Sequence, residues 1–167
     1  IHKSYEEYIE SKKNIFRNQT EKGIVVLNYD NDITRYFASE AKGKVIFFSR
    51  KNRLDNGIIY DNGVIKSCVD GVRRHVMTID DAISLRGMHN YENICAAIAA
   101  TSSLVEPKIQ ARAIAKFKGV EHRLEYVRTI NGAKWYNDSI GTSPSRTMAG
   151  LNSFDKKIIL AEFEINK

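Results

Sequence analysis

The chain has 167 residues, enough for one ordinary domain or parts of two, and its hydrophobic content of 43% is that of a globular protein. Its apolar runs are far too short to span a bilayer, so we expect no membrane partner. The formal net charge of +6 fits either a nucleic acid or an anionic small substrate. Because acidic residues interrupt every basic cluster, we expect a local phosphate site and no nucleic-acid partner.

The first fifty residues alternate helices with short apolar strands. Ser4 can cap a helix over residues 4–18, and the polar run Asn28 to Asp32 can cap another that ends near residue 41. The intervening apolar runs, 24–27 and 45–48, are typical of strands covered on both faces. This spacing predicts a parallel β-α-β unit.

The next thirty residues change character. Two turn signals, Asp55-Asn56-Gly57 and Asp61-Asn62-Gly63, flank a short apolar run. Further short β-rich runs follow at 64–65 and 76–79. They predict a small antiparallel meander.

The remainder begins with two helices, from Asn90 to about Leu104 and from Pro107 to a stop at Gly119. Gly119 is the predicted boundary between domains 1–119 and 120–167. Beyond it, Asn131-Gly132 is a strong hairpin turn. The elements predicted there are strands at 123–130 and 133–136, a helix near 145–151 and a last strand at 158–161.

The two cysteines, Cys68 and Cys95, lack the spacing of a metal or redox motif. We expect them to be buried free thiols of a protein from a reducing compartment.

Lys12 is the first candidate functional residue, because it falls on the same helical stripe as Tyr5, Tyr8 and Ile9. A lysine on such a stripe either packs its stem and extends its amine to water, or is held near a metal or phosphate. Asn90 and Asn93, one helical turn apart, could pair with a purine edge, although Asn90 alone could simply cap its helix.

Two further candidates follow the Gly119 stop. His122 and Arg123 could reach a phosphate, for which arginine is well suited, or could be an ordinary surface pair. Asp138 ends a predicted strand, and ligand groups often gather beyond the carboxyl ends of strands. The same residues are also common in turns.

The order and spacing of these motifs resemble the Mur ligase family, and within it the enzymes that add D-glutamate. The stretches that carry the resemblance extend from the first helix to the strand after the boundary. They are Tyr8 to Phe16 (YIESKKNIF), Val26 to Asp30 (VLNYD), Gly87 to Asn93 (GMHNYEN), Phe117 to Glu125 (FKGVEHRLE) and Tyr136 to Ser139 (YNDS).

The resemblance implies an α/β protein: part of the central domain, with a mostly parallel sheet, helices and a small meander, followed by the start of a Rossmann-like C-terminal domain. It implies an ATP- and Mg²⁺-dependent ligase of the bacterial cytoplasm that serves cell-wall synthesis. Family members phosphorylate a carboxylate, and an amine then attacks the acyl phosphate. The implied substrates are UDP-N-acetylmuramoyl-L-alanine and D-glutamate.

The resemblance also assigns roles to particular residues. Lys12 matches a lysine that becomes carbamylated and helps to place Mg²⁺. Asn90 and Asn93 match residues near adenine, Arg123 with its neighbour His122 matches an arginine at the terminal phosphates, and Asp138 matches an aspartate that contacts the nucleotide. Thr142 lies where the D-glutamate contacts begin.

The sequence departs from the family pattern in two respects. No G-x-x-x-x-G-K-[ST] phosphate loop occurs in these residues, and the segment 161–167 does not match the family. We therefore expect a fragment that is inactive alone and self-associates through uncovered strand edges. Alternatives are another Mur ligase, a folylpolyglutamate synthase, or a non-catalytic structural or binding module.

Overall fold

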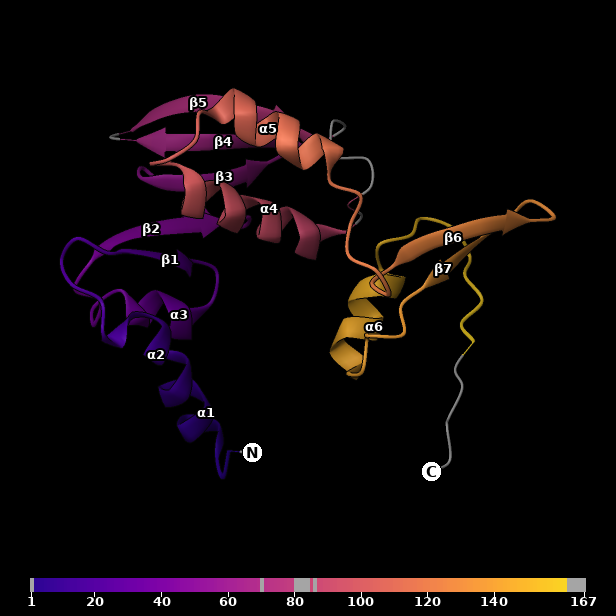
Figure 1. Ribbon diagram of the computed structural model, residues 1–167, viewed down its shortest axis with the longest axis horizontal. Helices are drawn as coiled ribbons and strands as arrows, with labels where there is room; N and C mark the ends of the chain where they lie inside the picture. Colours follow the sequence, from indigo (N-terminus) through magenta and orange to yellow (C-terminus); the bar gives the residue numbers. More distant parts are fainter. Residues whose placement is uncertain (1, 70, 80–84, 86, 162–167) are drawn as a thin grey trace. The chain divides into compact units, whose positions relative to one another are not determined.

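In the computed structural model, the described residues are 2–69, 71–79, 85 and 87–161. The chain divides into two compact units, each described by itself: Ile1–Ile83 with Tyr91–Phe117, and Ser84–Asn90 with Lys118–Lys167. The architecture is mixed α/β, as the sequence predicts (Figure 1).

One five-stranded sheet organises the first unit, with its strands in sequence order (Figure 1). The first three strands pair in parallel and the last two continue antiparallel. The predicted parallel unit and the predicted meander are therefore confirmed, and β2 and β3 join them into a single sheet. The strands are β1 (Ile24–Asn28), β2 (Lys44–Ser49), β3 (Gly57–Asp61), β4 (Val64–Val69) and β5 (Val72–Thr78).

Helices cover this sheet and supply its core. The short helix α3 packs against β1, and α5 packs against β5. Under β1, Phe16 and Phe37 meet with ring centroids 5.6 Å apart, beside the inward-facing Val25 and Leu27. The helices of this part of the chain are α1 (Tyr5–Lys12), α2 (Asn14–Arg17), α3 (Asp32–Phe37), α4 (Met88–Thr101) and α5 (Pro107–Lys116).

Helical spacing places Ile94, Cys95 and Ile98 of α4 on one face, and all three are buried. On α5, by contrast, Ile109 is half exposed, and the buried residue is Gln110. The Gln110 amide donates hydrogen bonds to the Ile98 carbonyl (3.1 Å) and the Thr101 hydroxyl (2.7 Å), which explains how a polar side chain can be buried there.

The second unit contains the predicted hairpin, β6 (Glu125–Ile130) and β7 (Ala133–Asn137), followed by α6 (Pro144–Leu151). Its turn has positive φ at Asn131 (49°) and Gly132 (80°), as a two-residue hairpin turn requires.

The predicted strand at 158–161 is wrong. These residues form neither a helix nor a strand in the described structure, and Ile159 is 97% exposed. An apolar run becomes a strand only when a partner strand accepts its backbone hydrogen bonds. The atypical segment 161–167 lies, except for Ala161, outside the described residues.

Candidate functional site

Lys12 is the last residue of α1, and its side chain is exposed. Its Nζ lies 5.0 Å from the centroid of the Tyr8 ring, a cation–π distance. The interpretation of a lysine on a buried apolar stripe is wrong, because Tyr5 and Tyr8 are themselves exposed and α1 contains no buried residue. An exposed amine is nevertheless accessible to small reactants.

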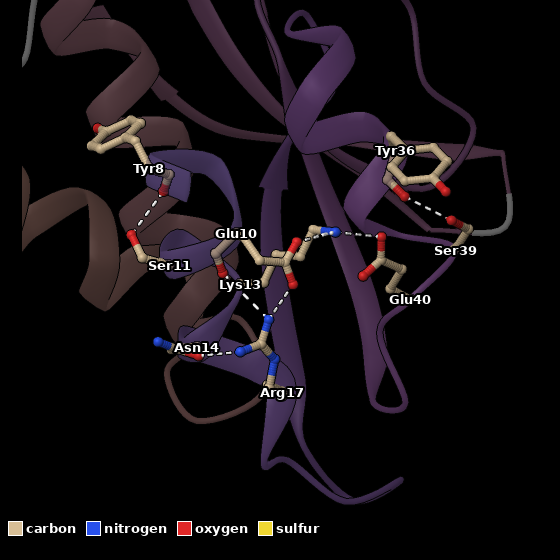
Figure 2. A network of polar contacts seen from close by, with 9 residues as sticks. All are labelled: Tyr8, Glu10, Ser11, Lys13, Asn14, Arg17, Tyr36, Ser39 and Glu40. Carbon is tan, nitrogen blue, oxygen red and sulfur yellow. Dashed lines mark hydrogen bonds and ion pairs between the residues drawn. The ribbon is translucent and has the colours of Figure 1, made fainter. Parts of the chain in front are cut away.

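The neighbouring Lys13 is the enclosed lysine of this region (Figure 2). Its side chain is 14% exposed, and its Nζ lies 2.7 Å from Glu40 Oε1 and 3.0 Å from Glu10 Oε2. The Glu40 and Glu10 hydrogen bonds raise the pKa of Lys13. Arg17 also pairs with Glu10 (Figure 2). This network fixes the end of α1, and with it the backbone that carries Lys12.

Asn90 and Asn93 both lie in the first two turns of α4. Asn93 is exposed and Asn90 is partly buried. Between them in sequence, Glu92 forms a 2.9 Å ion pair with Arg50, which follows the end of β2. The ion pair links this end of α4 to the carboxyl end of the sheet.

Asp30 organises a polar cluster at the carboxyl ends of β1 and β2. Its carboxylate accepts hydrogen bonds from the Ser49 hydroxyl (2.5 Å), the Arg50 amide (2.8 Å), the Lys51 amide (3.1 Å) and the Asn52 amide group (2.9 Å). Partial burial opposes ionisation, but these hydrogen bonds outweigh it and lower the pKa of Asp30. In sequence, Asp30 belongs to a polar run that can cap a helix and to a stretch that resembles the family, and neither feature assigns it a role.

His122 and Arg123 lie in a turn before β6 whose backbone is unusual. His122 (φ 63°) and Leu124 (φ 47°) both adopt the left-handed conformation, which costs a non-glycine residue about 1–3 kcal/mol. Arg123 lies between them with an exposed side chain. Within the described part of the chain, its guanidinium forms no hydrogen bond or ion pair, so it is available to an anion.

Asp138 follows β7 and lies against this same turn. Its Oδ1 accepts a 3.1 Å hydrogen bond from the Leu124 amide. The other oxygen, Oδ2, lies where Cβ atoms on Gly141 and Gly150 would come within 2.9 and 3.3 Å, so both positions suit glycine. The structure thus brings together His122, Arg123 and Asp138.

The other predicted residues are distributed along the chain. Thr142 is exposed, four residues after Asp138. Lys12 and Asn93 belong to the first unit, whereas Asn90, Arg123, Asp138 and Thr142 belong to the second.

The donor set for a metal ion is incomplete within the described residues. They contain no group of three or more His, Cys, Asp or Glu side chains arranged to hold a metal. A carbamate on Lys12 would contribute oxygen ligands of the kind that Mg²⁺ prefers, but as one ligand of several. A small open pocket lies on the hairpin between Val127 and Trp135, and none of the predicted site residues lines it.

Comparison with known proteins places the chain in a family. A family model described as the Mur ligase middle domain matches residues 1–101, and the chain belongs to the Mur ligase family. The predicted resemblance is therefore confirmed.

Its relatives include two proteins named UDP-N-acetylmuramoylalanine–D-glutamate ligase. Those from Ruminiclostridium cellulolyticum and Acetivibrio thermocellus are each 48% identical to the chain over 160 residues, which is 96% of this chain. The chain spans only 34% of the length of either relative.

Solved structures support the fold. MurF from Acinetobacter baumannii superimposes with a TM-score of 0.68 over 91% of this chain and 34% of that one, at 16% identity. In the described part of the chain, no helix has the length and apolar character needed to cross a membrane.

Proposed function

We propose that this chain is part of an ATP-dependent amide-bond ligase that adds D-glutamate to UDP-N-acetylmuramoyl-L-alanine in bacterial peptidoglycan synthesis. The observation that carries the proposal is the 48% identity, over nearly the whole chain, to relatives named for that reaction. Arg123, which precedes the Leu124 amide bound by Asp138, has an exposed guanidinium able to donate hydrogen bonds to phosphate oxygens.

The proposed reaction has two steps, phosphorylation of a carboxylate and formation of the amide bond. A carboxylate oxygen of the UDP-linked substrate attacks the terminal phosphorus of ATP, and the bond to ADP breaks. The neutral D-glutamate amine then attacks the acyl carbon and loses a proton to solvent, the amide bond forms, and inorganic phosphate leaves with the former carboxylate oxygen. Charge accumulates on phosphate oxygens in both steps, so the cationic Arg123, with His122 beside it, suits the terminal phosphates.

The remaining residues are proposed to bind and orient. Asn90 and Asn93 would contact adenine, Asp138 the nucleotide and Thr142 the incoming D-glutamate. Lys12, which is exposed, can react as the neutral amine with CO₂: the N–C bond forms, a proton is released, and an anionic carbamate results. Bound Mg²⁺ would neutralise phosphate charge, and the Lys12 carbamate would be one of its ligands.

We propose that residues 1–119 are the later part of the central ATP-binding domain and 120–167 the start of a Rossmann-like C-terminal domain. The 167 residues contain no phosphate loop, so we expect them to be inactive by themselves. We propose the bacterial cytoplasm as the location, because ATP and the nucleotide-linked substrate are found there.

The test uses the complete protein encoded by the gene. It is incubated with ATP, Mg²⁺, UDP-N-acetylmuramoyl-L-alanine and D-glutamate, and the product is identified by mass. We expect the addition of one glutamate and the release of one ADP per product. Product with a different amino acid or nucleotide-linked acceptor would indicate another Mur ligase. Glutamate added to a folate would indicate folylpolyglutamate synthase, and no ADP release with any pair would indicate a non-catalytic module.

We further propose that the isolated 167-residue chain self-associates. Strand β1 forms an edge of the described sheet, and Trp135 and Ile159 are exposed. Unpaired strand edges and exposed apolar side chains favour association. Sedimentation should show concentration-dependent oligomers, and a monomer at high concentration would contradict this.

A further inference from the structure

The turn that carries Arg123 has a backbone that its sequence does not favour. Four non-glycine residues of the described chain have positive φ. Asn62 and Asn131 precede glycines in hairpin turns, where asparagine is common. His122 and Leu124 have no such reason, and leucine in particular rarely adopts this conformation. Other contacts must therefore hold the turn.

Hydrogen bonds from the last residue of β7 and from the residues after it supply those contacts. The Ile140 amide donates to the His122 carbonyl (3.2 Å), and the Leu124 amide donates to Asp138 Oδ1 (3.1 Å). Asn137 contacts the His122 ring, with its Nδ2 2.9 Å from His122 Nδ1. The turn around Arg123 is thus tied to three residues at and just after the end of β7: Asn137, Asp138 and Ile140.

The Asn137 side chain forms hydrogen bonds through both its oxygen and its nitrogen. Its Oδ1 accepts a 3.0 Å hydrogen bond from the Ser139 amide, which fixes the orientation of the carboxamide. Its Nδ2 is therefore the donor, and His122 Nδ1 the acceptor. A neutral His122 then carries its proton on Nε2.

We propose that Asn137 is a positioning residue for Arg123: by binding the His122 ring, it holds the left-handed turn in the conformation that presents the guanidinium to a phosphate. The proposal rests on the proposed function, because it requires that Arg123 act on ATP. Asn137 itself contacts no substrate in this account. It acts only through the turn.

A double-mutant cycle in the complete protein tests this. Arg123→Ala should lower kcat about 100-fold or more, because it removes a charge that stabilises the transferring phosphoryl group. Asn137→Ala should lower kcat about tenfold, with little change in thermal stability. The double variant should be no slower than Arg123→Ala, since the residue that Asn137 positions is already absent.

Asn152→Ala is the matched control. Asn152 follows α6 in the same unit, is exposed, and its side chain forms no hydrogen bond within the described residues. The kcat of the Asn152→Ala variant should therefore equal that of the unmodified protein. Effects of Asn137→Ala and Arg123→Ala that multiply in the double variant would overturn the positioning role. If Arg123→Ala has no effect on ligation, the phosphate role of Arg123 is wrong and the positioning role falls with it.

A second measurement tests the hydrogen bond separately from catalysis. With ¹⁵N-labelled histidine, neutral His122 should show a protonated Nε2 and an unprotonated Nδ1. Asn137→Asp keeps the acceptor for Ser139 and presents an oxygen to the ring, so the proton should move to Nδ1. The same tautomer in both proteins would overturn the proposal even if ligation is observed.

Discussion

The Ser49 hydroxyl donates a 2.5 Å hydrogen bond to the Asp30 carboxylate, although 19 residues separate the two in sequence. Ser49 is 1% exposed and ends β2, while Asp30 follows β1. The pair therefore joins the carboxyl ends of two adjacent parallel strands. The amide of Arg50 binds the same carboxylate, and the Arg50 guanidinium then reaches Glu92 on α4.

Asp30→Ala should destabilise the protein by about 2–4 kcal/mol, because the buried Ser49 hydroxyl and two backbone amides lose their acceptor. Asp32→Ala is the matched control. The Asp32 side chain is 89% exposed and, within the part of the chain that the structure describes, pairs only with Arg35 at i, i+3, so its loss should change stability far less. Urea unfolding measures both. Equal effects would contradict a structural role for Asp30.

The same cluster predicts a pH dependence. The folded-state pKa of Asp30 is lower than its usual value of 3.8, so the ionised carboxylate stabilises the folded protein above that value. That contribution is lost as the pH falls from about 4 through the folded-state pKa. The stability difference between the unmodified protein and Asp30→Asn should therefore shrink between pH 6 and about pH 3. A difference that is independent of pH would show that the charge contributes nothing.

Substitution of Lys13 should affect stability, whereas substitution of its neighbour Lys12 should affect ligation. Lys13→Ala should lower the midpoint of thermal unfolding, because Glu10 and Glu40 lose their common partner. Lys12→Ala should leave that midpoint unchanged, because among the described residues the exposed Lys12 amine contacts only the Tyr8 ring. In the complete protein, Lys12→Ala should reduce ligation about 100-fold or more. If Lys12→Ala lowered the unfolding midpoint and Lys13→Ala abolished ligation, Lys13 would be the functional lysine and Lys12 the structural one.

The cysteines should be unreactive in the folded protein. Cys68 and Cys95 are free and buried, and burial raises the pKa of the Cys95 thiol to about 12. Alkylation at pH 8 requires thiolate and access, so neither residue should react until denaturant is added. Mass spectrometry counts the attached groups. Rapid labelling of Cys95 without denaturant would contradict its buried position.

The sequence predicts the elements well where local signals are strong. The alternation of apolar strands with capped helices gives the parallel unit, and the Asn-Gly turns at 62–63 and 131–132 give the β3–β4 and β6–β7 hairpins. The sequence-based predictions fail where a contact with a distant part of the chain determines the structure. The run at 158–161 has the composition of a strand but has no strand to pair with in the described chain. Ile109 has helical spacing, yet its neighbour Gln110 is buried because it finds two hydrogen-bond acceptors.

The candidate site is predicted less completely. The family resemblance points to Arg123 and Asp138, but nothing in the sequence assigns a role to Asn137, because its contact with His122 joins residues that are 15 positions apart. The Lys12 hypothesis started from an apolar stripe that the short α1 does not bury. Asp30 was missed because its four partners lie about twenty residues away along the chain.

The central claim, an ATP-driven ligation through an acyl phosphate, is tested most directly by following one oxygen atom. The complete protein is given UDP-N-acetylmuramoyl-L-alanine labelled with ¹⁸O in its carboxylate, together with ATP and D-glutamate. If the carboxylate is phosphorylated, each amide bond formed should release one inorganic phosphate that contains one labelled oxygen from the carboxylate. Phosphate without ¹⁸O, released as the amide forms, would contradict the account.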